Sequence, residues 1–366
     1  MKLIFFLIAF CILSVRVYFS WSGMERASRG ESTSNMVIKG DNFIEEMKYS
    51  GKFELTEDES AFKSISPGGY LKYRKNDTSV RAESDLQGVI EYTIYEGTDK
   101  IPMDARGKAK VAQAVREMIN WGYDAGPRME RIYKKGGFAA LSREVDSMKT
   151  DPVKILYLSR LFASDSLSPK DRISLIQKIG TLGADGDKFI FLNKMTPAQF
   201  QNPEIARAWF NVVDSMGSDM DKMRCLHHVL DQDQVSDSNA DKILILSSKL
   251  ESDMDKADLY RTMIRKGLDS GERFDRQLEL ISQMVADMDK INLYEVLMEQ
   301  KNISNEQWIL LINKTAGLGA DMDKSNLLIY IAQKMPKAEI IKAAYLKAAK
   351  TINEDSEYGK VLRAVN

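Results

Sequence analysis

Seven aspartates spaced 34 residues apart form the most regular chemical pattern in the sequence. They are Asp151, Asp185, Asp219, Asp253, Asp287, Asp321 and Asp355. A lysine follows each of the first six by three positions, and five of the units read Asp-x-Asp-Lys. Repeated carboxylate pairs could bind calcium. That ion, however, usually takes roughly six or more oxygen ligands, and two carboxylates beside a lysine supply too few.

We therefore expect these seven aspartates to cap helices. An N-cap aspartate accepts hydrogen bonds from free backbone N–H groups, and a second aspartate in the first turn meets the positive end of the helix dipole. In four units a methionine separates the paired acids, as Met220, Met254, Met288 and Met322. We expect these flexible apolar side chains to pack between neighbouring repeats rather than to carry redox chemistry.

Cys225, His227 and His228 form the only other cluster of metal-binding residue types. The cysteine aligns, at the repeat period, with Leu259, Leu293 and Leu327. Because those leucines occupy expected core positions, we predict a buried structural thiol and no metal site.

No arrangement of residues for catalysis is found. The two histidines of the chain are adjacent, which excludes the metallopeptidase pattern of histidines one helical turn apart. Cys11 and Cys225 are the only cysteines, too few for a zinc site or a disulfide framework. The sequence also lacks a Gly-rich phosphate loop and a nucleophile elbow. We expect no catalytic residue, no cofactor and no metal, and a protein that is not an enzyme.

The aspartate column belongs to units of 34 residues that cover 148–366 without an insertion. Such a period indicates stacked supersecondary units. After Asp287, apolar residues follow helical spacing, and Ser304 with Gln307 predicts a capping box that opens a second helix. Each unit is therefore a helical hairpin, and the row of units is an α-solenoid. The period equals that of tetratricopeptide repeats. The small residues of that family do not recur here, so we expect similar geometry without its peptide-binding residues.

The region before the repeats predicts a different architecture. Alternating apolar and polar residues with intervening turns make 42–102 a small antiparallel β-rich region. Connecting helices are expected over 103–147, where Gly136 and Gly137 divide two helical stretches, and Arg128, Arg131, Lys134 and Lys135 form a basic patch on a solvated helix face. The chain is thus predicted to be α+β, mainly α.

The first 22 residues resemble a secretory signal peptide. Lys2 precedes an apolar run from Leu3 to Leu13, and small residues at Ser20 and Ser22 allow cleavage. The alternatives are an uncleaved membrane anchor and, because of Cys11, a lipoprotein. Residues 23–41 have little apolar content and are predicted to be a disordered linker. We expect an exported protein, periplasmic or associated with the bacterial cell envelope, that touches a membrane only through this N-terminal segment.

The overall charge limits the classes of partner. The chain of 366 residues has 52 Lys plus Arg and 53 Asp plus Glu, a net charge of −1. It shows no global basic surface for nucleic acid.

The stretch from Phe53 to Tyr70, with the phrase Ser-Ile-Ser-Pro-Gly-Gly at 64–69, precedes the Asp-x-Asp-Lys units. Together these features resemble the extracytoplasmic module appended to some bacterial beta-lactam-sensor-type membrane metallopeptidases and anti-sigma-factor-like proteins. The resemblance covers about residues 43–366 and lacks the metallopeptidase signature. It implies a non-catalytic binding or sensing module.

Our leading hypothesis is therefore a non-catalytic protein-interaction scaffold that binds a protein partner through the solenoid surface and acts in envelope sensing or regulation. A second hypothesis is an envelope carbohydrate-binding protein or enzyme with a pocket at the junction of sheet and helices. The aromatic residues considered for that pocket are Tyr70, Tyr73, Tyr92, Tyr95 and Trp121. A third hypothesis is folding that depends on calcium.

Overall fold

The computed structural model describes residues 16–18, 34–40, 43–164 and 167–365 of the chain. The chain divides into two compact units, residues 1–171 and 172–366, which are described separately below. Within the described residues, no helix is long and apolar enough to cross a membrane.

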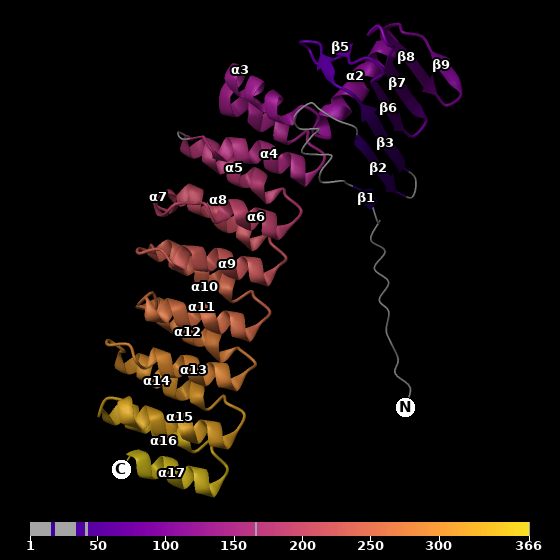
Figure 1. The fold of residues 1–366 in the computed structure, drawn as a ribbon. Helices are drawn as coiled ribbons and strands as arrows, with labels where there is room; N and C mark the ends of the chain where they lie inside the picture. Colours follow the sequence, from indigo (N-terminus) through magenta and orange to yellow (C-terminus); the bar gives the residue numbers. More distant parts are fainter. Residues whose placement is uncertain (1–15, 19–33, 41–42, 165–166, 366) are drawn as a thin grey trace, which may run out of the picture. The chain divides into compact units, whose positions relative to one another are not determined.

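The first unit contains an antiparallel sheet of seven strands in the order β1-β2-β3-β6-β7-β8-β9 (Figure 1). These strands are β1 (Arg16–Tyr18), β2 (Ser34–Gly40), β3 (Phe43–Ser50), β6 (Tyr70–Lys75), β7 (Thr78–Ser84), β8 (Ile90–Glu96) and β9 (Asp99–Ile101). Two further strands, β4 (Phe53–Leu55) and β5 (Phe62–Ile65), pair only with each other. The tight turn from β6 to β7 is made possible by Asn76, whose φ of 50° lies in the left-handed region that asparagine tolerates.

Two of these strands change the predicted organisation of the N-terminal region. β2 lies inside the predicted linker 23–41 and pairs with β3 along seven residues, so the linker prediction is wrong for 34–40. The β-branched pair Val37 and Ile38 favours a strand there, although the surrounding composition is polar. β1 lies inside the predicted signal segment 1–22. Residues 1–15 and 19–33, which carry most of both predictions, lie outside the described residues.

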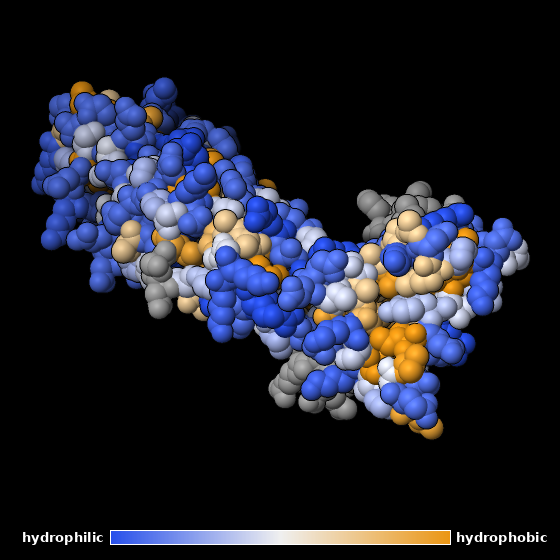
Figure 2. Space-filling view, turned by 90° about the horizontal axis from the view of Figure 1, so that it is seen from above, coloured by the Kyte–Doolittle hydropathy of each residue, from blue (hydrophilic) through white to orange (hydrophobic). Residues whose placement is uncertain are grey.

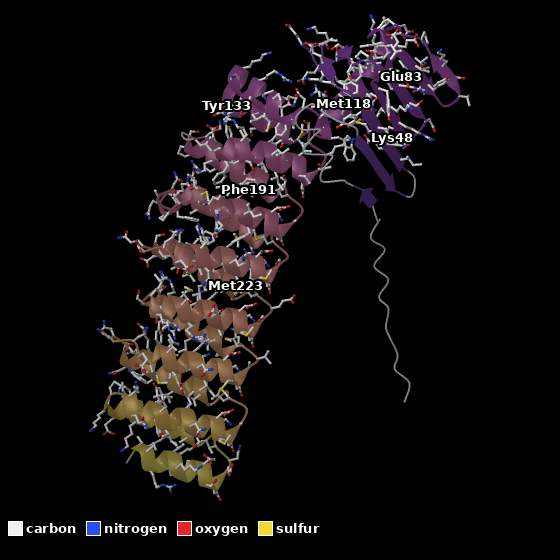
Figure 3. All side chains as sticks on the ribbon, viewed as in Figure 1. Lys48, Glu83, Met118, Tyr133, Phe191 and Met223 are labelled. Carbon is white, nitrogen blue, oxygen red and sulfur yellow. The ribbon has the colours of Figure 1, made fainter. Side chains whose placement is uncertain are left out.

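One face of the sheet is buried by helix α2 (Ala105–Asn120). Met47, Tyr49 and Leu71 of the sheet share a hydrophobic core with Val115 and Met118 of the helix. Figure 3 shows Met118 beside the sheet that carries Lys48 and Glu83. The strands alternate buried and exposed residues, so the opposite face of the sheet, hereafter the open face, carries polar side chains.

Charged groups are also buried in this unit. Glu45 is 2% exposed, and its carboxylate is 2.8 Å from Nζ of Lys149 and 3.8 Å from Nζ of Lys75. Lys149 also pairs with Glu117 at 2.6 Å. Because a buried charge is tolerated only when it is paired, this cluster fixes α2 against β3 and β6.

Two more helices complete the first unit. They are α3 (Ala125–Val145), which is interrupted at Gly137 with a φ of 59°, and α4 (Asp151–Phe162). The interruption agrees with the predicted division of two helical stretches at Gly136 and Gly137. Helix α5 (Pro169–Gly180) runs across the unit boundary at residue 171.

The second unit is a solenoid of helical hairpins. Its helices are α6 (Asp185–Leu192), α7 (Pro197–Phe200), α8 (Pro203–Asp214), α9 (Asp219–Leu230), α10 (Asp237–Ser247), α11 (Asp253–Arg265), α12 (Glu272–Ser282), α13 (Asp287–Leu297), α14 (Asn305–Thr315), α15 (Asp321–Lys334), α16 (Glu339–Ala349) and α17 (Asp355–Val365). The predicted α+β, mainly α fold with helical-hairpin repeats is confirmed.

The hairpins stack in the order of the sequence (Figure 1). The first helices of successive repeats contact one another in the series α6, α9, α11, α13, α15 and α17. The second helices form a neighbouring layer, in which α8 contacts α10 and α14 contacts both α12 and α16. The capping box of α14 at Ser304 and Gln307 is present as predicted. Each repeat therefore buries its apolar faces against its neighbours.

Candidate functional site

The helices of the repeats begin at the repeated aspartates, so each aspartate lies one position after the N-cap where it was predicted. The N-cap is the preceding residue in the six units from Asp151 to Asp321: Thr150, Ala184, Ser218, Ser252, Ala286 and Ala320. At Ser218, for example, the backbone is extended, with φ −83° and ψ 111°, and its hydroxyl accepts from the N–H of Asp221. Each repeated aspartate is the first residue of its helix, so the prediction that it is the N-cap is wrong. Its place in the first turn still suits the helix dipole.

The carboxylate of the repeated aspartate binds the next repeat as well as a lysine of its own helix. In Asp253, Oδ2 accepts from the backbone N–H groups of Val285 and Ala286, at 2.6 and 3.0 Å. Its Oδ1 lies 3.1 Å from Nζ of Lys256. We call this arrangement the Asp–Lys clamp. It connects the start of one first helix to the loop that leads into the next first helix.

The clamp recurs along the solenoid with small variations. Oδ2 of Asp185 accepts from Gly217 and Ser218, and Oδ2 of Asp321 accepts from Asn353 and Glu354. Asp219 and Asp287 each accept from one backbone N–H, that of Glu251 at 2.6 Å and that of Gly319 at 2.7 Å. The lysine contact is closest at Asp185, where Nζ of Lys188 is 2.8 Å away. Asp151 pairs with Lys154 at 3.6 Å, and Asp355 is exposed in the last helix.

These contacts change the acidity of the aspartates. Burial alone would raise the pKa of Asp185, but the ammonium of Lys188 and the N–H groups of Ser218 and Gly217 outweigh it, so the pKa is lowered. At Asp287 the N–H of Gly319 and the ammonium of Lys290 lower the pKa. Asp253 and Asp321 are shifted in the same direction by the corresponding groups. The clamp thus favours the ionised carboxylate.

The clamp also explains why the aspartate column is a poor place for a cation. Each clamp carboxylate already faces an ammonium and at least one N–H group, which compete with any metal for its oxygens. Within the described part of the chain, no group of three or more His, Cys, Asp or Glu residues is arranged to hold a metal ion.

The methionines between the paired acids are exposed, contrary to the prediction that they pack between repeats. Met220, Met254, Met288 and Met322 are 61, 73, 67 and 59% exposed. Hydrophilic residues cover most of the molecular face seen in Figure 2, so exposed apolar side chains are the exception on it. Consecutive helical residues point about 100° apart around the axis. Because the clamp directs the aspartate toward the next repeat, the following side chain turns to solvent.

The four methionines form one line, because each is the second residue of its helix and these helices, α9, α11, α13 and α15, contact in series. With neighbouring helices about 8–10 Å apart, the line spans roughly 25–30 Å. The equivalent positions in the flanking repeats are Gly186 and Ser356, so the line is bounded at both ends. We call these four residues the methionine edge.

The edge is also acidic. Asp255, Asp289 and Asp323 directly follow three of the methionines and are partly exposed. Val285, 89% exposed, lies in the loop before Met288 and adds further apolar surface. The sequence revealed the methionine period but not its exposure, since hydropathy alone does not give the direction of a side chain at a helix start.

The cysteine and histidine cluster does not converge. Cys225 is buried, as predicted, and burial raises its pKa to about 12. Nε2 of His227 lies 2.8 Å from Oδ2 of Asp258, whereas Nε2 of His228 lies 2.8 Å from the carbonyl oxygen of Met195. The three side chains therefore have separate structural roles.

The aromatic residues considered for a carbohydrate pocket are divided between the two faces of the sheet. Tyr73 and Trp121 are buried in the core, and Tyr92 packs against it. Tyr95 is 39% exposed and, like Tyr70, lies on the open face. These five side chains do not form one pocket.

A cavity of about 600 Å³ does lie between β4, the loop that follows it and the start of α3, but other residues line it. Phe53 and Tyr123 form part of its wall. The Tyr123 hydroxyl accepts a hydrogen bond from the backbone N–H of Phe53 and donates one to its carbonyl oxygen. Arg131, at its rim, pairs with Asp124. Arg128, predicted on a solvated helix face, is instead 2% exposed and pairs with Glu59 and Glu144. Acidic and basic residues are mixed here, so no single class of ligand is favoured.

Comparisons with protein-family models, with curated proteins and with solved structures found no match to this chain.

Proposed function

We propose that this chain is a non-catalytic protein-interaction scaffold whose contact surface is the methionine edge. The observation that carries the proposal is the exposure of four methionines at equivalent positions of four consecutive repeats. A solenoid holds such positions at fixed spacing, which suits a partner that lies along several repeats.

Exposed methionines suit this role physically. Burying a methionine side chain contributes about 1.5–3 kcal/mol, and its flexible thioether adapts to the partner's surface. The aspartates beside the edge add negative charge. The partner is therefore expected to present apolar side chains flanked by lysine or arginine, because opposite charges favour and orient the encounter.

Export to the bacterial envelope is part of the same proposal. It is supported by the apolar run from Leu3 to Leu13 and by the resemblance described above. The N-terminal mass of the natural protein tests it: loss of about the first 22 residues supports export by a cleaved signal, whereas a mass that includes them contradicts cleavage.

The methionine edge can be tested by photocrosslinking in the native host. A photoreactive phenylalanine analogue is placed at Met254 or Met288, and in a control chain at Ile340, an apolar residue of α16 that is 54% exposed. The two edge positions should give the same crosslinked protein, and the control position should not. The purified partner then allows its dissociation constant to be measured.

The double variant Met254→Ser and Met288→Ser is expected to weaken that binding by about tenfold for each methionine, since about 1.4 kcal/mol corresponds to a factor of ten. Ile340→Ser is the matched control and should leave the affinity unchanged. Equal affinities of the double variant and the unmodified protein would overturn the proposal.

A further inference from the structure

Three cations lie directly opposite one another on the open face of the sheet. Lys48 of β3 is in register with Lys72 of β6, and Lys72 is in register with Arg81 of β7. We call these residues the cationic row. The next residue across the sheet is Thr93 of β8. Since neighbouring strands are about 4.8 Å apart, the row places positive charges at intervals of about 5 Å along a line perpendicular to the strands.

Like charges at directly opposed positions repel one another and weaken a sheet. Lys48 and Arg81 are partly neutralised by Glu46 and Glu83 on their own strands, at 2.6 and 2.5 Å. Lys72, at the centre, instead has its ammonium 4.7 Å from the ring centroid of Tyr70. Among the described residues, neither Lys72 nor the nearby Arg74 has a carboxylate within ion-pair distance. The row therefore retains positive charge that a bound anion would neutralise.

A hollow of about 350 Å³ lies over this row. Besides the three cations, Arg74, Ser79, Tyr95 and the acidic Glu46 line it. Arg74, Ser79 and Tyr95 are themselves in register on β6, β7 and β8, so they form a second line beside the row. One side of the hollow thus offers the cationic row. The other side offers Arg74, a hydroxyl and a partly exposed aromatic ring, and it begins at Glu46, whose carboxylate is paired with Lys48.

We propose that the open face binds an acidic polysaccharide, with its carboxylate or sulfate groups along the cationic row and a sugar ring against Tyr95. A linear polyanion can follow charges that are spaced at regular intervals across a sheet. The hydroxyls of Ser79 and Thr93 can bond to sugar hydroxyls, and an aromatic ring provides an apolar face for a pyranose. Binding to single-stranded nucleic acid without sequence preference relies on successive stacked bases, and this hollow has one exposed ring. This inference concerns the first unit and does not depend on the methionine edge.

The test uses the full chain and defined probes. Polygalacturonate and dextran sulfate are the acidic polysaccharides, uncharged dextran is the neutral probe, and tripolyphosphate, a thymidine oligonucleotide and polyglutamate are anions of other classes. Dissociation constants are measured by calorimetry at low and at moderate salt. Both acidic polysaccharides should bind, more weakly at the higher salt because the charges are screened, and dextran should not.

The double variant Lys72→Glu and Arg81→Glu should weaken polysaccharide binding by at least thirtyfold. Lys108→Glu with Arg143→Glu makes the same change of charge at exposed positions of α2 and α3, outside the hollow, and should change binding less than threefold. Equal loss in both double variants would show that only net charge matters, and would overturn the site.

Further measurements identify the class of ligand and test whether the charges of the row repel one another. Tyr95→Ala should weaken polygalacturonate about fivefold and leave tripolyphosphate unchanged. Tighter binding of the oligonucleotide or of polyglutamate than of both polysaccharides, with the same dependence on Lys72 and Arg81, would overturn the saccharide assignment.

Lys72→Glu alone should raise the melting temperature of the chain, because it replaces repulsion from Lys48 and Arg81 by attraction to both. A lower melting temperature would contradict the repulsion within the cationic row.

Discussion

In five of the repeats a single carboxylate has two partners that lie far apart in the sequence. One oxygen of Asp253 faces Lys256 in the same helix, and the other binds backbone N–H groups more than 30 residues later. Hydrogen bonds to a charged acceptor are stronger than neutral ones. A residue that looks like a local helix cap therefore stabilises an interface between repeats.

Replacing Asp253 by alanine should lower the free energy of unfolding of the chain by about 2 kcal/mol, because two N–H groups lose a charged acceptor. Asp255→Ala is the matched control two residues away. It removes only a first-turn charge and should cost about 0.5 kcal/mol. Urea denaturation followed by circular dichroism measures both. Equal losses would show that Asp253 acts through the helix dipole rather than through the next repeat.

The sequence revealed this column but could not reveal its role. The donors are backbone N–H groups of residues as different as Gly217, Val285 and Asn353. Since any residue except proline offers such a donor, the residues that bind the carboxylate cannot be recognised by their type in the sequence. The same holds for the cationic row, whose members are adjacent only once the strand register is known.

At the scale of elements, the first unit is held together by buried ions as well as by apolar packing. Arg128 of α3 donates to Glu59 in the loop between β4 and β5, to Glu144 of α3 and to the hydroxyl of Tyr157 in α4. It thereby connects two helices and a small β-hairpin. A surface lysine or arginine could not do this, because its charge would be satisfied by water.

Arg128→Met should lower the stability of the first unit by about 3–5 kcal/mol, because Glu59 and Glu144 would lose their buried partner. Arg131→Met, one turn along the same helix, removes an arginine that is half exposed and should cost about 1 kcal/mol or less. Hydrogen exchange over 53–65 and 125–145 reports the difference. Unchanged protection in the Arg128 variant would contradict a connecting role.

Elements of the chain differ in how far the sequence predicts them. The hairpins were predicted because a fixed period and helical spacing are both local signals, and the capping box at Ser304 was found where expected. β2 was missed because its neighbours are polar and its strand character arises from pairing with β3. Arg128 was assigned to a solvated face because its burial depends on Glu59, which is 69 residues away in the sequence.

For the whole molecule, the clamps make stability depend on pH. The pKa values of Asp185, Asp253, Asp287 and Asp321 are lowered in the folded chain. A lowered folded pKa gives stability that is complete above the unfolded value, near 3.9 for aspartate, and is lost as the pH falls through the folded value. The solenoid should therefore lose stability below about pH 4–5.

Urea denaturation at about pH 7, 4.5 and 3 measures this loss. The double variant Asp253→Asn and Asp287→Asn should be less stable at neutral pH. It should lose less stability on acidification, because two of the carboxylates whose protonation destabilises the folded chain have been removed. A double variant whose stability falls as steeply as that of the unmodified chain would show that other carboxylates control the acid response.

The clamps also give the solenoid a direction and a mechanical weak point. Every carboxylate reaches forward along the chain, so tension applied along the stack would load the interfaces in series. Asp219 holds the next repeat through one N–H, and its lysine, Lys222, is 3.6 Å away, whereas Asp185, Asp253 and Asp321 each hold two N–H groups and have a closer lysine. Under such tension, the clamp with the fewest and longest contacts is expected to break before the others. Among the five clamps that bind the next repeat, the clamp of Asp219 is thus the one expected to separate first, while the contact of His227 with Asp258 still joins the same two repeats.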